Sequence, residues 1–155
     1  MPDGGPPPLR PFGLVLHHDG SWTHEGVPIR NARLRAAFDR SVRYLPEAAA
    51  FVVQLWRFRG VIEVEEAGFF VRSFDPDTGL ISLSDRSQEL LAPASLRVSA
   101  RDGAFLCLVK RDLIPSGLLA RKSRSLNSSR WYCSASWVSF HSDLVPCLWS
   151  RRCSA

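Results

Sequence analysis

The sequence lacks the features that mark several large classes of protein. No apolar run approaches the roughly 18 residues of a membrane-spanning helix. The opening residues, MPDGGPPPLRPF, contain no apolar stretch of the kind found in secretory signals. There is no G-x-S-x-G sequence of the serine hydrolases and no glycine-rich phosphate loop. We therefore expect a cytoplasmic protein without membrane contacts, and no catalytic residue can be assigned from a motif.

Cysteine is scarce as well, and its spacing excludes the common zinc motifs. The four cysteines form no C-x-x-C pair, and no histidine lies at zinc-ligand spacing from them. Cys107 lies in AFLCLV, where a small buried residue fits. The other three lie in the final 23 residues: Cys133, Cys147 and Cys153. We expect a reducing compartment, no disulfide framework and no cofactor or metal.

The charge is present but unevenly distributed. The 155 residues include 20 Lys+Arg and 15 Asp+Glu, a net charge of +5. Residues 1–118 are neutral, so residues 119–155 carry the whole excess. A basic tail attracts nucleic acid nonspecifically, but a solvated chain end explains the same charge. The whole chain has 45% apolar and 23% charged residues, which is a globular composition, and we expect no nucleic-acid partner.

The sequence GLVLHHDGSWTHEG predicts a β-hairpin near the N-terminus. Asp19-Gly20 is a favoured two-residue turn, because both turn positions need a positive φ. That register pairs His17 with Trp22 and Val15 with His24. These four side chains would then share one face of the hairpin.

A helix is predicted after the hairpin, over residues 32–43. Asn31 can cap its N-terminus, and Pro46 should end it. Three basic side chains, Arg33, Arg40 and Arg43, lie on its far side. The stripe that should face the core comprises Leu34, Ala37, Phe38, Ser41 and Val42.

The remainder reads as an antiparallel β-meander, so the fold class is α+β. Strands are predicted over 51–58, 61–66, 69–74, 80–84, 96–99 and 104–109, with Gly60 as a separator and 85–95 irregular. A second Asp-Gly hairpin, Asp102-Gly103, would place Val98 opposite Cys107. A final helix is predicted after Gly117. The predicted core contains Trp22, Leu34, Phe38, Val53, Leu55, Ile62, Val64 and Val98.

The chain divides into three segments. Residues 1–12 form a Pro/Gly-rich tail that we expect to be disordered, and 13–124 form the α+β domain. Residues 125–155 are an atypical tail rich in Ser, Arg, Trp and Cys. HDGSW (18–22) and RDGAF (101–105) hint at an internal repeat, with halves at 13–75 and 76–124.

Two constellations could carry chemistry. His17 and His24 would be diagonal neighbours roughly 7–8 Å apart, within reach of one metal ion, but no third ligand is evident. Glu63 and Glu65 would lie about 6.6 Å apart on one strand face, a spacing compatible with acid–base catalysis. The alternation with Ile62 also fits a half-solvated strand, and we favour that reading.

The first hairpin has two interpretations, a binding site or a cap over the core in which Trp22 and His24 have a structural role, and the structural one is at least as well supported. A hairpin turn explains Asp19 and Gly20 but requires no Trp-x-His, and a ring beside an imidazole suits a small ligand or peptide. The arginines of the helix could bind phosphate or an acidic partner, although a solvated face is the simpler explanation. The candidate binding residues are His17, Trp22, His24, Arg33, Arg40 and Arg43.

Several segments resemble one known family. They are DGSWTHEGVPI (19–29), RFRGVIEVEEAGFFVRSFD (57–75), LSDRSQELLAPASLRV (83–98), DGAFLCLVK (102–110) and LLARKSR (118–124). Together they resemble the bacterial domain-of-unknown-function 1285 family over roughly residues 14–124. The resemblance implies an α+β fold with repeated structural motifs, no established enzymatic activity and a link to signalling. It carries no catalytic residue onto this sequence.

The resulting hypothesis is a non-enzymatic binding or regulatory module in bacterial signal transduction, acting on a small ligand or a protein partner. One alternative is an enzyme with an unrecognised site built from His24 and Glu63 or Glu65. The other is a weak nucleic-acid binder that uses the basic tail.

Overall fold

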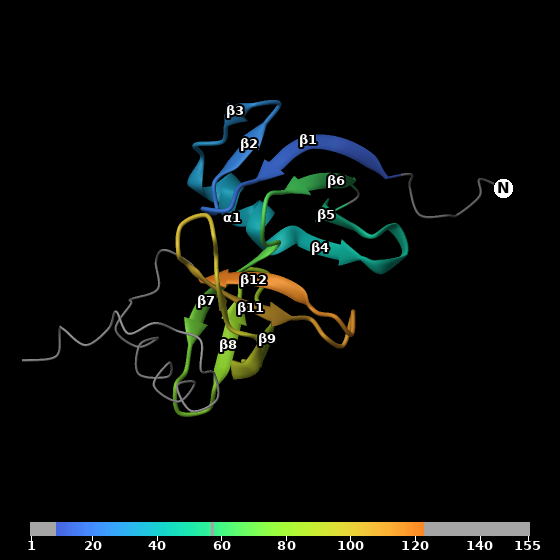
Figure 1. Ribbon diagram of the computed structural model, residues 1–155. Helices are drawn as coiled ribbons and strands as arrows, with labels where there is room; N and C mark the ends of the chain where they lie inside the picture. The colour runs from blue at the N-terminus through green and yellow to red at the C-terminus, as the bar shows by residue number, and fades with distance from the viewer. Residues whose placement is uncertain (1–8, 57, 123–155) are drawn as a thin grey trace, which may run out of the picture.

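The protein folds into two six-stranded β-sheets, one above the other in Figure 1. The structure, a computed structural model, describes residues 9–56 and 58–122. The expected atypical tail over 125–155 therefore lies outside the described residues, as does most of the Pro/Gly-rich start. Strand structure begins at Arg10, so residues 10–12 are ordered rather than disordered. None of the helices in the described ranges has the length and apolar character needed to cross a membrane.

The first sheet has the order β3-β2-β1-β6-β5-β4 and carries the α-helix of the described residues. Its strands are β1 (Arg10–Leu16), β2 (Trp22–His24), β3 (Val27–Pro28), β4 (Val42–Leu45), β5 (Ala50–Leu55) and β6 (Phe58–Val64). Helix α1 (Ala32–Ser41) connects β3 to β4, and a 3-10 turn, η1 (Pro46–Ala48), connects β4 to β5.

The second sheet has the order β10-β11-β12-β7-β8-β9. Its strands are β7 (Phe69–Phe74), β8 (Leu80–Leu83), β9 (Gln88–Leu90), β10 (Arg97–Val98), β11 (Phe105–Val109) and β12 (Leu118–Lys122). A 3-10 turn, η2 (Pro93–Ser95), occupies the place that α1 holds in the first sheet.

The two sheets have the same topology. In each, the first and last strands pair in parallel at the centre: β1 with β6, and β7 with β12. Every other strand pair is antiparallel in the described residues. Counting the second sheet from β7 reproduces the order of the first. The α+β class is thus confirmed in outline, and the matching topology supports a repeat. The prediction of an antiparallel meander is wrong, because the central strands of each sheet pair in parallel.

The repeat does not follow the motifs that suggested it. HDGSW forms the turn between β1 and β2, whereas RDGAF joins β10 to β11. The first motif lies in the first connection between strands of its half, and the second motif lies in the fourth connection of its half. The two motifs are therefore not at equivalent positions of the repeat. The boundary between the two sheets lies at residues 65–68. The expected boundary after residue 75 placed residues 69–74 in the first half, but they form β7 of the second sheet.

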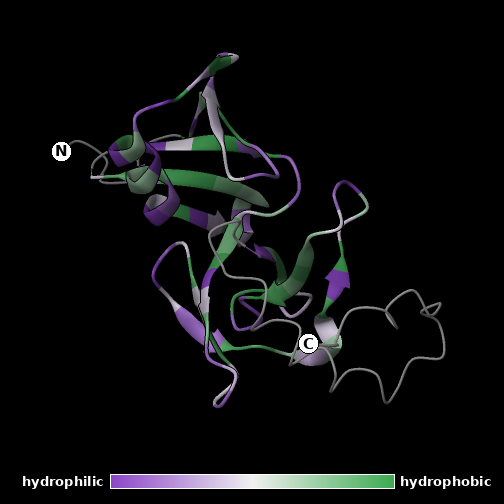
Figure 2. Ribbon diagram, turned by 90° about the vertical axis from the view of Figure 1, so that its left-hand side faces the viewer, coloured by the Kyte–Doolittle hydropathy of each residue, from purple (hydrophilic) through white to green (hydrophobic). Residues whose placement is uncertain are grey.

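One apolar core runs through both sheets, and Figure 2 shows apolar residues concentrated along the strands. Trp22, Phe38, Val53 and Ile62 are buried as predicted, and Leu55 and Val64 pack against the core. Two predictions are wrong, since Leu34 is 42% exposed and Val98 is 60% exposed. Phe38 is the buried residue of α1, so the helix contacts the core at Phe38 and not at Leu34, one turn earlier.

Three element predictions need correction. The helix ends at Ser41 rather than residue 43, because Val42 takes an extended conformation and pairs with Val53. Residues 118–122 form a strand rather than a helix, since they lie between β11 and β7. The stretch 85–95 is not wholly irregular, because it contains β9 and η2.

Gly60 lies inside β6 rather than between strands. A Cβ atom on this residue would come within 2.2 Å of the Phe12 ring. Glycine is therefore needed because an aromatic side chain from β1 crosses the backbone of β6 at this point.

Both predicted hairpin registers are wrong. In the first hairpin Leu16 pairs with Trp22, one residue away from the prediction. The His17 N–H donates to the Ser21 carbonyl at 3.0 Å, and the Gly20 N–H donates to the His17 carbonyl at 3.0 Å, so the loop is longer than two residues. A one-residue shift reverses side-chain faces, so His17 does not share the face of Trp22. In the second hairpin Val98 pairs with Phe105 instead of Cys107.

Candidate binding site at the junction of the two halves

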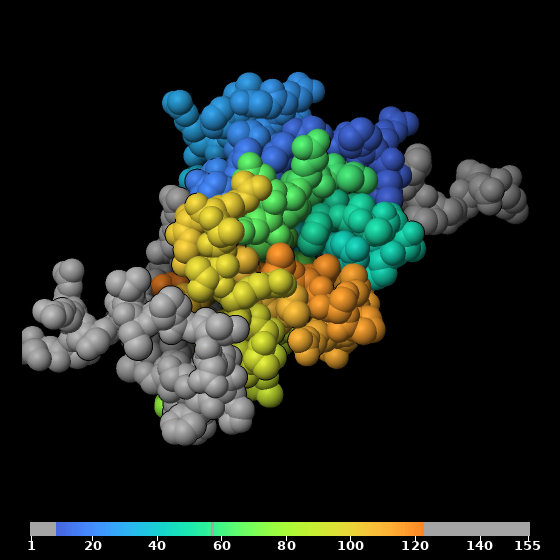
Figure 3. All heavy atoms as spheres, viewed as in Figure 1, coloured from blue at the N-terminus to red at the C-terminus, as the bar shows by residue number. Residues whose placement is uncertain are grey.

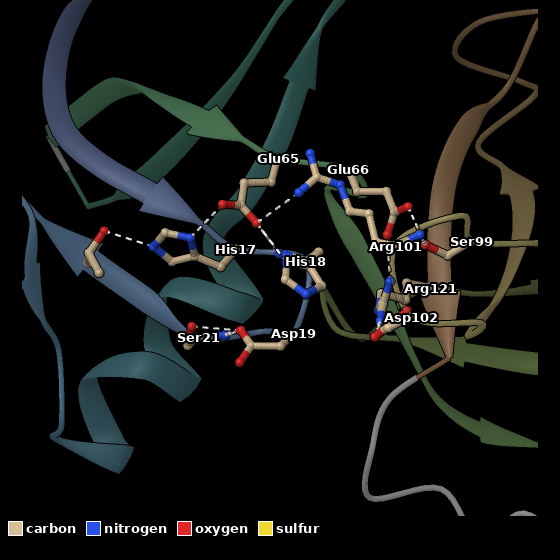
Figure 4. Close-up of polar contacts among 11 residues, drawn as sticks. His17, His18, Asp19, Ser21, Glu65, Glu66, Ser99, Arg101, Asp102 and Arg121 are labelled. Carbon is tan, nitrogen blue, oxygen red and sulfur yellow. Dashed lines mark hydrogen bonds and ion pairs between the residues drawn. The ribbon is translucent and has the colours of Figure 1, made fainter.

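Glu65, directly after β6, collects hydrogen bonds from the first hairpin (Figure 4). Its Oε2 accepts from the backbone N–H of His18 at 2.9 Å and from the His18 Nδ1 at 2.8 Å. Its Oε1 accepts from the His17 Nδ1 at 2.9 Å. Arg101, from the loop between β10 and β11, brings its Nη1 to 3.9 Å from Oε2. One carboxylate therefore contacts loops from both halves.

These contacts stabilise the ionised form of Glu65. The backbone N–H of His18, followed by the side chains of His18 and His17, lowers the Glu65 pKa from 4.5 to about 2. A carboxylate only accepts hydrogen bonds, so the Nδ1 atom of each imidazole carries the proton. The Nε2 of His17 is also engaged, since it lies 3.0 Å from the Thr23 hydroxyl.

A second polar cluster lies beside Glu65 and is centred on Arg121 of β12. The Arg121 side chain is 3% exposed, and its guanidinium pairs with Glu66 and with Asp102. The Ser99 hydroxyl donates to Glu66 at 2.6 Å. Burial raises the pKa of Asp102, but hydrogen bonds from the Ala104 N–H and Arg121 outweigh it, so the pKa is lowered overall. Glu66 lies in the segment that connects the two sheets. Its ion pair with the buried Arg121 therefore attaches this segment to the second half.

The loop between β10 and β11 reaches up to the first half, where it lies against the blue and green segments in Figure 3. Next to this contact the surface is hollowed in two places. The smaller hollow has a volume of about 450 Å³. It is lined mainly by the first hairpin and by the residues that precede α1 in the sequence. Its lining residues are His17, His18, Asp19, Ser21, Trp22, Thr23, Pro28, Ile29, Arg30 and Arg35.

The larger hollow, about 730 Å³, lies between α1 and the second sheet. From the first half it is lined by Asp19, Gly20, Ala32, Arg35, Ala36, Asp39 and Arg40. From the second half it is lined by Phe70, Arg72, Ser82, Leu83, Ser84 and Arg86. Asp19 and Arg35 belong to both hollows, which therefore adjoin.

Asp39, which lines the larger hollow, is hydrogen-bonded to Trp22, which lines the smaller one. Its Oδ1 accepts from the indole Nε1 of Trp22 at 2.9 Å, and its Oδ2 accepts from the Arg72 Nη2 at 2.5 Å. Trp22 also packs on Phe38, with ring centroids 5.3 Å apart. The hairpin, α1 and β7 are thereby held in one arrangement.

Three of the six candidate binding residues line the hollows. His17 and Trp22 line the smaller one, and Arg40 lines the larger one. His24, Arg33 and Arg43 are exposed and line neither. Arg43 instead donates to backbone carbonyls of Arg40 and Val42.

The predicted His24–Glu constellation is not assembled. His24 pairs with Leu14, whereas Glu63 pairs with the next residue of β1, Val15, so the two lie on opposite faces of the sheet. Glu65 contacts His17 and His18 instead. Among the described residues no group of three His, Cys, Asp or Glu could hold a metal ion.

Sequence reasoning identified Arg40 but missed the other three arginines at the larger hollow, Arg35, Arg72 and Arg86. Ala32, Arg35, Ala36, Asp39 and Arg40 follow the spacing i, i+3, i+4, i+7 and i+8, which is one helix face. That stripe of small and charged residues was available as a signal. Arg72 and Arg86 come from the other half, and no local pattern brings them to α1.

The structure resembles solved structures of one family. A DUF1285 family protein from Silicibacter pomeroyi DSS-3 matches with a TM-score of 0.53 and 15% identity, over 88% of this chain and 79% of that one. A DUF1285 family protein from Shewanella baltica OS155 matches with a TM-score of 0.50 and 15% identity, over 82% of this chain and 91% of that one. No family model and no curated protein matches the sequence. The likeness that five sequence segments suggested is thus confirmed by the structure: this chain has the fold of DUF1285 family proteins.

Proposed function

We propose that the protein is a non-enzymatic binding module of the bacterial cytoplasm, and that its ligand occupies the two adjoining hollows around Asp19 and Arg35. One observation carries the proposal: the larger hollow is walled by α1 on one side and by β7 and β8 on the other. A ligand held there contacts both halves at once. Its occupancy would favour one relative position of the halves, which is the property a regulatory module in signal transduction needs.

The dimensions and chemistry of the hollows support this proposal. Ligand sites are concave, of about 300–1,000 Å³, and combine apolar walls with a few polar groups. The larger hollow has a volume of about 730 Å³, with Phe70 and Leu83 among its arginines and serines. Of the residues proposed from sequence, His17, Trp22 and Arg40 are placed to contribute. We further propose that residues 13–124 contain the whole binding unit.

Arg35 gives a direct test because it lines both hollows. A thermal-shift screen of a fragment library against the full chain should yield compounds that raise its melting temperature. Arg35→Gln should abolish those shifts, whereas Arg33→Gln, the same change on the exposed face of α1, should preserve them. A screen without any stabilising compound, or with shifts that Arg35→Gln leaves intact, would contradict the proposal.

A second candidate is an acid–base enzyme in which His18 is the base. The supporting observation is the 2.8 Å contact between His18 Nδ1 and Glu65, together with the position of His18 at the smaller hollow. A carboxylate on one ring nitrogen orients an imidazole and fixes its tautomer, which leaves the other nitrogen able to accept a proton. Turnover of p-nitrophenyl acetate that His18→Ala removes and His24→Ala retains would favour this candidate; equal rates in both variants would eliminate it.

A further inference from the structure

We propose that the larger hollow binds an organic phosphate, whose phosphate group is held by arginines from both halves; this inference rests on the proposed function and names its ligand class. The hollow contains four arginines and two aspartates, a formal excess of two positive charges. Arg35 and Arg40 come from α1, while Arg72 comes from β7 and Arg86 from the connection between β8 and β9.

The charge excess is not neutralised within the part of the chain that the structure describes. Asp39 pairs with Arg72, which accounts for one arginine of the four. The guanidinium groups of Arg40 and Arg86 have neither a carboxylate nor a hydrogen-bond acceptor among residues 9–56 and 58–122. Within the same ranges the Nε of Arg35 is buried without a partner. A buried donor without an acceptor is costly, so an anion beside Arg35 would satisfy a group that the described residues leave unpaired.

Phosphate is the anion that suits these groups. A guanidinium is a planar fork of donors without acceptors, and it binds phosphate or carboxylate oxygens in pairs. A carboxylate offers two oxygens, which one arginine occupies. A phosphate monoester offers three and carries up to two charges, so it can engage several arginines together.

The remainder of the hollow calls for an organic group on that phosphate. Phe70 and Leu83 are buried core residues that reach its surface, and Ala32 and Ala36 line the facing side of α1. The Ser84 hydroxyl oxygen accepts from the Phe70 N–H at 3.1 Å. A phosphate ion fills little of about 730 Å³ and leaves this apolar part wet, whereas a ring on the phosphate would cover it.

Because the arginines come from both halves, a bound ligand would link the two halves. Arg40 and Arg86 belong to different halves, so a phosphate between them adds a link across the seam beside the Asp39–Arg72 ion pair. Binding should therefore raise the melting temperature of the whole chain by mass action.

The test uses isothermal titration calorimetry of the full chain with phenyl phosphate, inorganic phosphate and phenol, at fixed ionic strength because exposed charges are screened by salt. Phenyl phosphate should bind more tightly than inorganic phosphate, and phenol should not bind. Arg40→Gln and Arg86→Gln should each weaken phenyl phosphate about tenfold, the loss of one charge-assisted contact. Arg33→Gln, with the same charge change on α1 outside the hollow, should leave the dissociation constant unchanged.

Equal weakening by Arg33→Gln would overturn the inference, because it would show attraction to net charge rather than to the hollow. Tighter binding of a 12-nucleotide single strand than of phenyl phosphate would also overturn it in favour of nucleic acid. A third outcome is that phenyl phosphate does not bind, while uncharged fragments still stabilise the native chain and not Arg35→Gln. That outcome would reject an organic phosphate as the ligand but would leave the proposed binding module in place. Melting curves of each unliganded variant establish that it is folded.

Discussion

The indole Nε1 of Trp22 donates to Asp39, 2.9 Å away, while the other oxygen of Asp39 accepts from Arg72. Trp22 is buried in β2, Asp39 lies on α1, and Arg72 belongs to the second sheet. A single carboxylate thus connects three elements, and the exposed fraction of its side chain is only 15%. The helix is positioned by this contact as well as by Phe38.

Removal of this carboxylate should destabilise the protein. In Asp39→Ala the buried indole N–H loses its acceptor, which costs about 1–3 kcal/mol in the free energy of unfolding. Asp39→Asn keeps an amide oxygen for Trp22 and loses only the charge, so its cost should be smaller. Urea denaturation of both variants measures the difference. Equal losses would mean that the ion pair to Arg72, and not the indole contact, is the main contribution.

Acid should weaken the junction through Glu65. Its pKa is about 2 in the folded protein and near 4.5 ordinarily. A lowered folded-state pKa contributes stability that is complete above about pH 4.5 and lost as the pH falls toward 2, because the unfolded chain binds the proton first. Glu65→Gln should therefore flatten the acid limb of a plot of melting temperature against pH. Glu63→Gln, two residues earlier on β6, is the matched control and should leave that limb unchanged.

Gly60 should not tolerate a side chain. A Cβ at this position would lie 2.2 Å from the Phe12 ring, so Gly60→Ala must displace β1 or the ring and should cost about 1–3 kcal/mol. The measurement is again the free energy of unfolding. Phe12→Ala in the Gly60→Ala background should add less destabilisation than Phe12→Ala in the native chain. Additive costs would show that the ring can move aside freely.

The helix offers a paired test of which of its turns contacts the core. Phe38 is 8% exposed and packs on Trp22, so Phe38→Ala should cost about 3–5 kcal/mol. Leu34, one turn earlier, is 42% exposed, and Leu34→Ala should cost less than about 1 kcal/mol. Denaturant titrations measure both losses. A reversed order would mean that the helix contacts the core at its first turn, because Leu34 and Phe38 are four residues apart and lie on the same face.

The sequence was sufficient for most elements because their signals are local. Asn31 caps α1 by accepting from the Arg33 and Leu34 N–H groups, as its position before the helix predicted. The register of the first hairpin was not predictable from Asp19-Gly20, since the same dipeptide fits loops of two lengths. The choice depends on burying Leu14 and Leu16 together with Trp22, which is a tertiary requirement.

The candidate site was less predictable because it is built from both halves. His17, Trp22 and Arg40 could be proposed from their own neighbourhoods. Arg86 reaches the hollow from the connection between β8 and β9, far from α1 in sequence. The central parallel pairs of strands also have no local signal, because each joins segments about 50 residues apart.

Those parallel pairs bear on the order in which the chain folds. The centre of the first sheet cannot close until β6 has been synthesised, and loop closure over about 50 residues carries an entropic cost that must be met before any contact compensates for it. No strand of the first sheet pairs with a strand of the second within the described ranges. The strand pairing of the first sheet therefore needs no residue of the second sheet, and we expect the first sheet to form independently of it. Glu65 emerges with its histidine partners already made and its partner Arg101 still to come, so the seam and its hollows should be the last features to form.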